Sequence, residues 1–213
     1  MLKHLYFPLI ICIISFLPEI GVAQSFKSGL TVGVSNARVL GGVNKEGWRQ
    51  FGIIAGPFVE YDLNELSGLK MEMLFSQKGE RKPYRPNAGD YTFYKLRLNY
   101  IEIPVLYFHS HNKFIFEAGP SFGYLIGHKV EDLHGPTELD RPYKKLDFGA
   151  NLGINYQLTE HLDMNWRYSN SIIPVRDHIG NVVWRYNRGE YNSVLTFKVI
   201  YWFNKNHIHT GGK

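Results

Sequence analysis

The stretch that decides the fold is residues 145–157, KLDFGANLGINYQ, in which apolar residues alternate with polar or small ones. One face of this segment consists of Leu146, Phe148, Ala150, Leu152, Ile154 and Tyr156. The other face consists of Asp147, Gly149, Asn151, Gly153 and Asn155. A period of two residues is that of a β-strand, and it does not fit the period of a helix. The segment therefore predicts a strand with one apolar face and one small, polar face.

The same period recurs on both sides of this segment and predicts eight strands in all. The other seven are expected at residues 27–35, 51–63, 69–78, 93–108, 114–127, 162–169 and 191–203. Short connections at 63–68, 110–113 and 157–161 alternate with long polar ones at 36–50, 79–92, 128–144 and 173–190. This asymmetry is typical of outer-membrane barrels, whose short turns face the periplasm. We expect an all-β fold, a single eight-stranded antiparallel up-and-down transmembrane β-barrel.

A soluble barrel of the lipocalin type is the alternative, with its apolar face around a ligand and its polar face in water. Glycines on the polar face favour the membrane barrel, because small residues fit a narrow interior. They are Gly29, Gly33, Gly52, Gly56, Gly119, Gly123, Gly149 and Gly153. The apolar face carries aromatic residues near strand ends, as an aromatic girdle requires. They are Tyr124, Tyr156, Trp166, Tyr168, Tyr201 and Phe203.

The N-terminal residues predict export to the cell outer membrane. Lys3 precedes an apolar run at 5–17, and the small residues GVA follow at 21–23. This is the pattern of a cleaved signal peptide, and the run is shorter than the roughly 20 residues of a spanning helix. We expect a signal peptide at 1–23, the barrel at 24–203 and a C-terminal tail at 204–213. Cys12, the only cysteine, would leave with the signal, so the barrel would have no disulfide and no thiolate metal site.

Charged residues on the polar face of the strands predict a lumen filled by ion pairs. These residues are Glu60, Asp62, Lys70, Glu72, Glu117, Asp147, Asp163, Arg167 and Lys198, with Lys27 and Glu102 as additions. An unpaired buried charge is costly, so charges of both signs in a narrow interior should pair. Acid/base catalysis by Glu60 and Asp62 would need substrate access, which a filled lumen denies. The expected result is a salt-bridged plug without a wide channel.

Residues 95–107, KLRLNYIEIPVLY, resemble a signature of the Bacteroidota outer-membrane β-barrel proteins, the PorT-like group. Further segments are similar to the same family in the same order: FSQKG at 75–79, EAGP at 117–120 and DFG at 147–149. The resemblance implies an eight-stranded outer-membrane barrel. It implies little about activity, because most such proteins have no assigned role, although the name-giving member is associated with a protein-secretion system. The tail after Phe203 departs from barrels of this kind, which often end on the aromatic residue.

No sequence motif demands catalysis, a metal or a cofactor. His109 and His111, like His207 and His209, are spaced two residues apart, but a metal site would need a third ligand within reach. Ser169 or Ser171 with His178 could be imagined as a lipid hydrolase, although no orienting group accompanies them. The net charge of +5 is spread without a long Lys/Arg run, which is weak evidence for nucleic acid. We expect no enzyme, no cofactor and no nucleic-acid partner.

Basic and aromatic residues in the long connections form the candidate interaction surface. They are Trp48, Arg81, Lys82, Arg85, Arg176, Trp184 and Arg185. Arginine and lysine could bind lipopolysaccharide phosphates through charge-assisted hydrogen bonds, and the aromatic rings could contact a protein partner. We expect a structural, surface-interaction or secretion-accessory role. The expected partners are outer-membrane lipids and lipopolysaccharide, the barrel-assembly machinery, and secretion-system or surface proteins. The alternatives are small-solute transport of the porin kind and a lipid-modifying enzyme.

Overall fold

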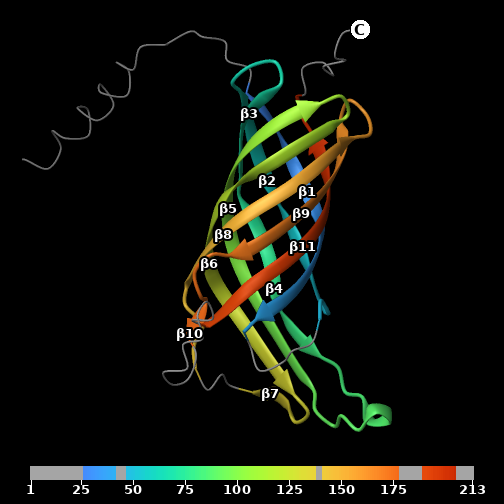
Figure 1. The fold of residues 1–213 in the computed structure, drawn as a ribbon, viewed down its shortest axis with the longest axis vertical. Helices are drawn as coiled ribbons and strands as arrows, with labels where there is room; N and C mark the ends of the chain where they lie inside the picture. Colours follow the sequence, from blue (N-terminus) through green and yellow to red (C-terminus); the bar gives the residue numbers. More distant parts are fainter. Residues whose placement is uncertain (1–25, 42–46, 138–140, 178–188, 205–213) are drawn as a thin grey trace, which may run out of the picture.

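The computed structural model describes residues 26–41, 47–137, 141–177 and 189–204 as one closed β-barrel (Figure 1). The strands that form its wall are β1 (Lys27–Leu40), β2 (Gln50–Asp62), β3 (Ser67–Glu72), β4 (Leu74–Lys82), β5 (Tyr94–His111), β6 (Phe114–Asp132), β8 (Leu146–Gln157), β9 (Leu162–Ser171) and β11 (Gly189–Trp202). Short β7 (Gly135–Thr137) pairs with β6, β10 (Arg176–Asp177) pairs with β11, and η1 (Pro86–Ala88) is a 3₁₀ turn. The expected segments are therefore all strands.

The first and last strands pair with each other, and this contact closes the ring. Val34 of β1 lies opposite Ile53 of β2 on one side and Phe197 of β11 on the other. The order round the barrel is β1, β2, β3 and β4, β5, β6, β8, β9, β11, with antiparallel pairing throughout. Closure gives each strand of the wall a partner on both sides, as a lipid bilayer requires because it offers no hydrogen bonds to the backbone.

β3 and β4 occupy one position in the ring and act as a single spanning strand, interrupted at Met73. The Met73 N–H donates to the Pro57 carbonyl at 3.0 Å. Pro57 has no N–H to return a hydrogen bond, so the ladder is incomplete at this point. The pairing resumes on either side, with Phe58 opposite Glu72 and Ala55 opposite Phe75. The predicted strand at 69–78 is therefore present as β3 and β4 together.

The two ends of the barrel differ as the connection lengths predict. At one end, the turn end, β2 joins β3, β5 joins β6 and β8 joins β9 through short turns. The β5–β6 turn consists of Asn112 and Lys113, and Asn112 has the left-handed conformation that tight hairpins need (φ 54°). Phe203 and Ser28 bring the last and first strands together at this end, through a hydrogen bond of 2.9 Å. The longer connections lie at the opposite, loop end (Figure 1).

Several strands continue further toward the loop end than their sequence pattern predicts. β1 runs to Leu40 and β6 to Asp132, whereas the expected strands end at residues 35 and 127. The predicted loops at 36–50 and 128–144 therefore begin too early, because their first residues still belong to β1 and β6. Figure 1 shows the β4–β5 and β6–β7 hairpins projecting beyond the other strand ends. This projection places charged strand residues outside the apolar band of the wall.

The two faces of the wall separate by polarity. Exposed apolar side chains cover the outside, and they include Val34, Ile53, Val105, Phe116, Leu152, Trp166 and Leu195. Charged side chains such as Lys70, Glu72, Arg167 and Lys198 are buried inside. Within the described ranges, no helix is long and apolar enough to cross a membrane. An outward apolar face around a polar interior is the arrangement of a barrel in lipid, so the lipocalin alternative, which puts the apolar face inside, does not fit.

Candidate functional site

Arg167 of β9 is the centre of the charged lumen. Its guanidinium donates two hydrogen bonds to the Glu72 carboxylate of β3, at 2.5 and 3.0 Å. It donates two more to Glu117 Oε1 of β6, at 2.6 and 2.8 Å. All three side chains are at most 2% exposed. One planar cation on β9 therefore joins a carboxylate of β3, on the opposite side of the ring, to a carboxylate of β6.

Two lysines and a third carboxylate complete this central network. The Lys70 ammonium lies 3.5 Å from the carboxylates of both Glu60 and Glu72, and these contacts are ionic without a close hydrogen bond. Lys198 donates to Glu72 at 3.3 Å. Six of the predicted lumen residues thus meet in one cluster, which consists of Glu60, Lys70, Glu72, Glu117, Arg167 and Lys198. Its three cations balance its three carboxylates, as a buried site requires.

A second ion cluster fills the lumen between the central network and the loop end. Lys78 of β4 contacts Glu102 at 2.5 Å and Asp147 at 3.0 Å. Asp147 also accepts hydrogen bonds from Ser171 at 2.7 Å and Asn192 at 2.9 Å. Asp147 and Glu102 are predicted lumen residues, whereas Lys78 is not among the lumen residues expected from the sequence. Its position two residues after inward-facing Ser76 is the signal that could have identified it.

The two remaining predicted lumen carboxylates lie toward the turn end and do not join these clusters. Asp62 pairs with Lys27 at 2.7 Å. Asp163 accepts a hydrogen bond from the Trp202 indole N–H at 2.8 Å. Trp202 packs edge-to-face on Phe58, and both rings are buried. The turn end of the lumen is therefore closed by aromatic packing as well as by charge.

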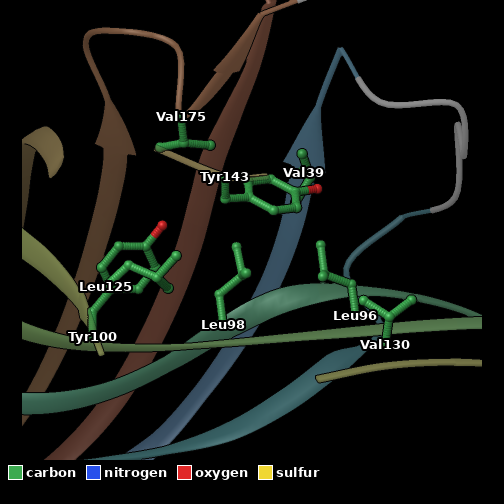
Figure 2. Close-up of a cluster of buried hydrophobic side chains, with 8 residues drawn as sticks. All are labelled: Val39, Leu96, Leu98, Tyr100, Leu125, Val130, Tyr143 and Val175. Atoms are coloured by element: carbon green, nitrogen blue, oxygen red, sulfur yellow. The ribbon is translucent and has the colours of Figure 1, made fainter. Parts of the chain in front are cut away.

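A cap of buried apolar side chains closes the loop end of the lumen (Figure 2). It consists of Val39, Leu96, Leu98, Tyr100, Leu125, Val130, Tyr143 and Val175, and Figure 2 shows the Tyr143 ring beside Leu96 and Leu98. Tyr143 donates a hydrogen bond to Glu190 at 2.9 Å, and burial raises the pKa of this phenol. Two connections and strands from opposite sides of the barrel thus meet above the ion clusters.

Arg176 belongs to this cap, contrary to its predicted place on a free loop surface. Its guanidinium donates to the Glu190 carboxylate at 2.7 and 2.9 Å and lies 4.3 Å from the centre of the Tyr143 ring. The side chain is 13% exposed. Both its charge and its planar face are thus engaged within the protein, and Arg176 links Glu190 to the Tyr143 ring of the cap.

The projecting β4–β5–β6 hairpins carry a basic face, which consists of Arg81, Lys95, Arg97 and Lys129 around one carboxylate, Glu131. Arg81 lies opposite Lys95, and Arg97 lies opposite Lys129. Glu131 pairs with Lys129 at 2.7 Å and with Lys95 at 3.0 Å. Hydrogen bonds from Lys129 and Lys95 lower the pKa of Glu131 to about 2, so its carboxylate stays charged at neutral pH. The face has an excess of positive charge.

The tip of the β4–β5 hairpin adds aromatic groups to this surface. Tyr84 and Tyr91 are both exposed, and their rings pack at 6.2 Å. Lys82, a predicted contact residue, pairs with Asp90 at 3.1 Å, and Arg85 forms a backbone bridge with Asp90. Predicted Arg81 is exposed on the basic face itself. Predicted Trp184 and Arg185 lie outside the described residues.

Trp48 packs on the outside of the wall, away from the basic face. Its ring meets Tyr168 of β9 at 6.1 Å, and the Arg38 guanidinium lies 4.6 Å from its centre. Trp48 is therefore part of the wall surface near the membrane boundary rather than of a loop tip.

The histidines do not assemble into a site in the described part of the chain. His109 contacts the Ser67 hydroxyl at 2.8 Å in the turn-end region, and His207, His209 and His178 lie outside the described residues. Among the residues described, no three His, Cys, Asp or Glu side chains are grouped as a metal site requires.

Comparison with known proteins gives a family and a fold. Residues 22–177 match the family described as "Outer membrane protein beta-barrel domain". The attachment invasion locus protein Ail of Yersinia pestis is similar in structure, with a TM-score of 0.50 and 12% identity over 84% of this chain and all of that one. The Neisserial surface protein A (NspA) gives a TM-score of 0.47 and 14% identity over 83% of this chain and 96% of its own. No curated protein sequence matches the chain. The chain belongs to the outer membrane protein beta-barrel domain family and is a protein of the outer membrane.

Proposed function

We propose that this protein is a non-enzymatic surface-interaction protein of the PorT-like kind, from the Bacteroidota, whose basic face binds an acidic protein partner of a secretion system or of the cell surface. The observation that carries the proposal is that the lumen is closed, whereas the projecting β4–β5–β6 hairpins carry a charged face outside it. The segments that resemble PorT-like proteins support the assignment to that group. Insertion by the barrel-assembly machinery and contact with lipopolysaccharide belong to the same proposal.

The lumen supports a role outside the barrel interior. Three closures follow one another along the described interior: the Phe58–Trp202 packing, the ion clusters around Arg167 and Lys78, and the apolar cap. A solute would have to separate buried charges from their partners, which costs several kcal/mol for each ion. We therefore favour binding over solute transport, and we expect purified protein in planar lipid bilayers to give no single-channel steps.

The basic face supports recognition of a protein. It projects from the wall on paired strands, so the cations are held in a regular array instead of on a loop. Arginine and tyrosine are enriched at protein–protein contacts, and Arg81, Tyr84 and Tyr91 are all exposed here. Complementary charge mainly increases the rate of encounter and selects the partner. An acidic, partly apolar protein surface is the partner that fits this combination.

The test is photo-crosslinking in the native host, with a crosslinking amino acid at Tyr91 and, as the control, at exposed Lys145, which lies beside Leu125 of β6 and outside the basic face. We expect a discrete protein adduct from Tyr91 and none from Lys145. The double variant R97Q/K129Q should abolish the adduct, whereas K113Q/K145Q, which removes the same charge elsewhere, should leave it. Equal adducts from both positions, or an adduct indifferent to R97Q/K129Q, would refute the basic face as the binding site.

The enzymatic alternative has its own test. A lipid-modifying enzyme would change the acylation of lipid A or of phospholipids when the gene is expressed or deleted. We expect identical lipid profiles in the two strains by mass spectrometry. A difference in acyl-chain number would contradict a non-enzymatic role.

A further inference from the structure

A groove crosses the outer wall between two rows of cross-strand neighbours. The first row consists of Phe116, Ile154, Trp166, Phe197 and Val34, each opposite the next on adjacent strands. The second row consists of Leu152, Tyr168, Leu195, Asn36 and Phe51, paired in the same way. The rows lie two residues apart on each strand, about 7 Å. The groove between them has a volume of about 630 Å³, within the range of small-molecule sites, and its lining is almost wholly apolar.

The groove runs from the turn-end half of the wall to the loop end. Phe116 lies near the start of β6, next to the β5–β6 turn. Asn36 and Phe51 lie at the other extreme, where β1 approaches the first long connection and β2 leaves it. An acyl chain in the groove would therefore run obliquely across the wall, with its head group at the loop end. By the general rule for these barrels, the loop end faces the cell exterior.

A polar strip borders the groove at its loop end, on the side of the wall that faces lipid. The next row of cross-strand neighbours consists of Asn170, Ser193 and Arg38. Tyr168 lies below this row, and its hydroxyl contacts the Ser193 hydroxyl at 3.1 Å. The lipid-facing positions of such barrels are normally apolar, and charged residues there are destabilising near the middle of the bilayer. A change from an apolar groove to a polar strip matches the junction between acyl chains and a lipid head group.

Two polar groups at the loop end of the groove, one in its second row and one in the strip, have unused hydrogen-bonding capacity. The Asn36 Oδ1 and the Arg38 Nε are buried and have no hydrogen-bond partner among the described residues. Arg38 also forms no ion pair in this part of the chain, and its guanidinium lies on the Trp48 ring. Trp48 in turn lies on Tyr168, which lines the groove. A free cation, an amide and an interfacial tryptophan are thus collected at the end of an acyl-sized groove.

We propose that this groove binds lipid A of the outer leaflet, with Arg38 donating to a phosphate, Asn36 contacting the glucosamine amide or hydroxyl groups, and one acyl chain lying between the two rows. Charge complementarity and the position of the polar strip at the loop end select this occupant. The site lies on β1, β9 and β11 and shares no residue with the basic face on β4, β5 and β6. The inference rests on the lipopolysaccharide contact named in the proposed function and gives it a site, while its failure would be distinguishable from failure of the basic face to bind a protein partner.

The test is native mass spectrometry of the detergent-solubilised protein with added bisphosphorylated lipid A, monophosphorylated lipid A or dioleoyl phosphatidylglycerol. We expect a one-to-one adduct with bisphosphorylated lipid A. The variant R38Q should reduce its retention about tenfold, the effect of losing one charge-assisted hydrogen bond. The variant L195W, which fills the groove without altering charge, should reduce retention to a similar extent. Heat-dependent gel migration would verify that each variant is folded.

Matched controls distinguish binding of lipid A at this site from its nonspecific attraction to a basic or apolar surface. K145Q removes an exposed cation at the loop end that belongs to neither proposed site, and V105W enlarges an exposed apolar residue on β5. Both should retain lipid A as the wild type does. Equal loss with K145Q, no loss with L195W, absence of the adduct, or equally Arg38-dependent retention of phosphatidylglycerol would each overturn the proposal.

Discussion

Removal of the Arg167 side chain should strongly destabilise the barrel. Arg167 makes all four of its short hydrogen bonds to Glu72 and Glu117, and the substitution R167M would leave both carboxylates buried with one cation too few. Breaking a buried ion pair by removing one partner typically costs about 3–5 kcal/mol. We expect R167M to lower the free energy of unfolding by this amount. For comparison, the whole stability of a typical protein is about 5–15 kcal/mol.

The double variant R167M/E117Q separates uncompensated charge from lost packing. It removes one charge of each sign, so Glu60 and Glu72 would again be balanced by Lys70 and Lys198. If excess charge is the cause, the double variant should be more stable than R167M, with a coupling energy on the order of 2 kcal/mol. If lost packing is the cause, the destabilisation caused by E117Q should add to that caused by R167M.

The assay is urea unfolding of the protein in lipid vesicles, followed by tryptophan fluorescence and by migration of unheated samples on gels. The free energy is obtained by linear extrapolation, and equal slopes for the variants would support comparable unfolding transitions. R97M is the control, because Arg97 faces outward on the projecting hairpin and should change stability by less than about 0.5 kcal/mol. An R167M barrel as stable as the wild type, or a double variant less stable than R167M, would refute the reasoning.

Three further outcomes follow from the structure. G119V should lower the free energy of unfolding by about 1–3 kcal/mol or prevent assembly, because a Cβ at Gly119 would lie 2.1 Å from a backbone oxygen. G47V is the control, because a Cβ at Gly47 meets open space. Urea unfolding compares the stability of the two variants. Y143F, which removes the hydrogen bond to Glu190, should increase hydrogen exchange of the cap while leaving the central network protected. The pKa of Glu131 is lowered to about 2. Its stabilising contribution is therefore complete above the ordinary pKa near 4.5 and is lost as pH falls toward 2. Glu131 itself should add no pH dependence to partner binding between pH 5 and 7; the crosslinking yields of the wild type and E131Q would measure this, and a difference between the two that changes over that range would contradict it.

The strands and the lumen could be predicted because the membrane imposes opposite polarity on the two faces of the wall. Glycines and charges share one face of each strand, and the structure places the charges of that face inside. The same logic fails beyond the bilayer. In β5, Ile101, Ile103 and Val105 face outward, but Leu96 and Leu98 face inward, while Lys95 and Arg97 take the outside. The apolar face changes side along one strand, because water replaces lipid as the outer environment.

This reversal explains which predictions were inaccurate. Residues 93–108 give a mixed pattern because the strand crosses from lipid to water within them, and the predicted ends of β1 and β6 are early for the same reason. Arg176 could not be assigned to the cap from its position, because its partners Tyr143 and Glu190 come from other connections and strands. Their meeting depends on closure of the barrel, which brings distant segments together after the strands have formed.

The segments that resemble the PorT-like family have a structural explanation in the lumen. FSQKG contains Lys78, the signature contains Glu102, EAGP contains Glu117 and DFG contains Asp147, and these segments lie on β4, β5, β6 and β8, successive neighbours in the ring. Lys78 bonds directly to Glu102 and Asp147, and Glu117 bonds to Arg167. The charged residues of the resemblance therefore build the ion clusters that fill the barrel. Proteins that share these segments can share a closed lumen without sharing a ligand, and what distinguishes one from another should lie on the projecting hairpins and the outer wall.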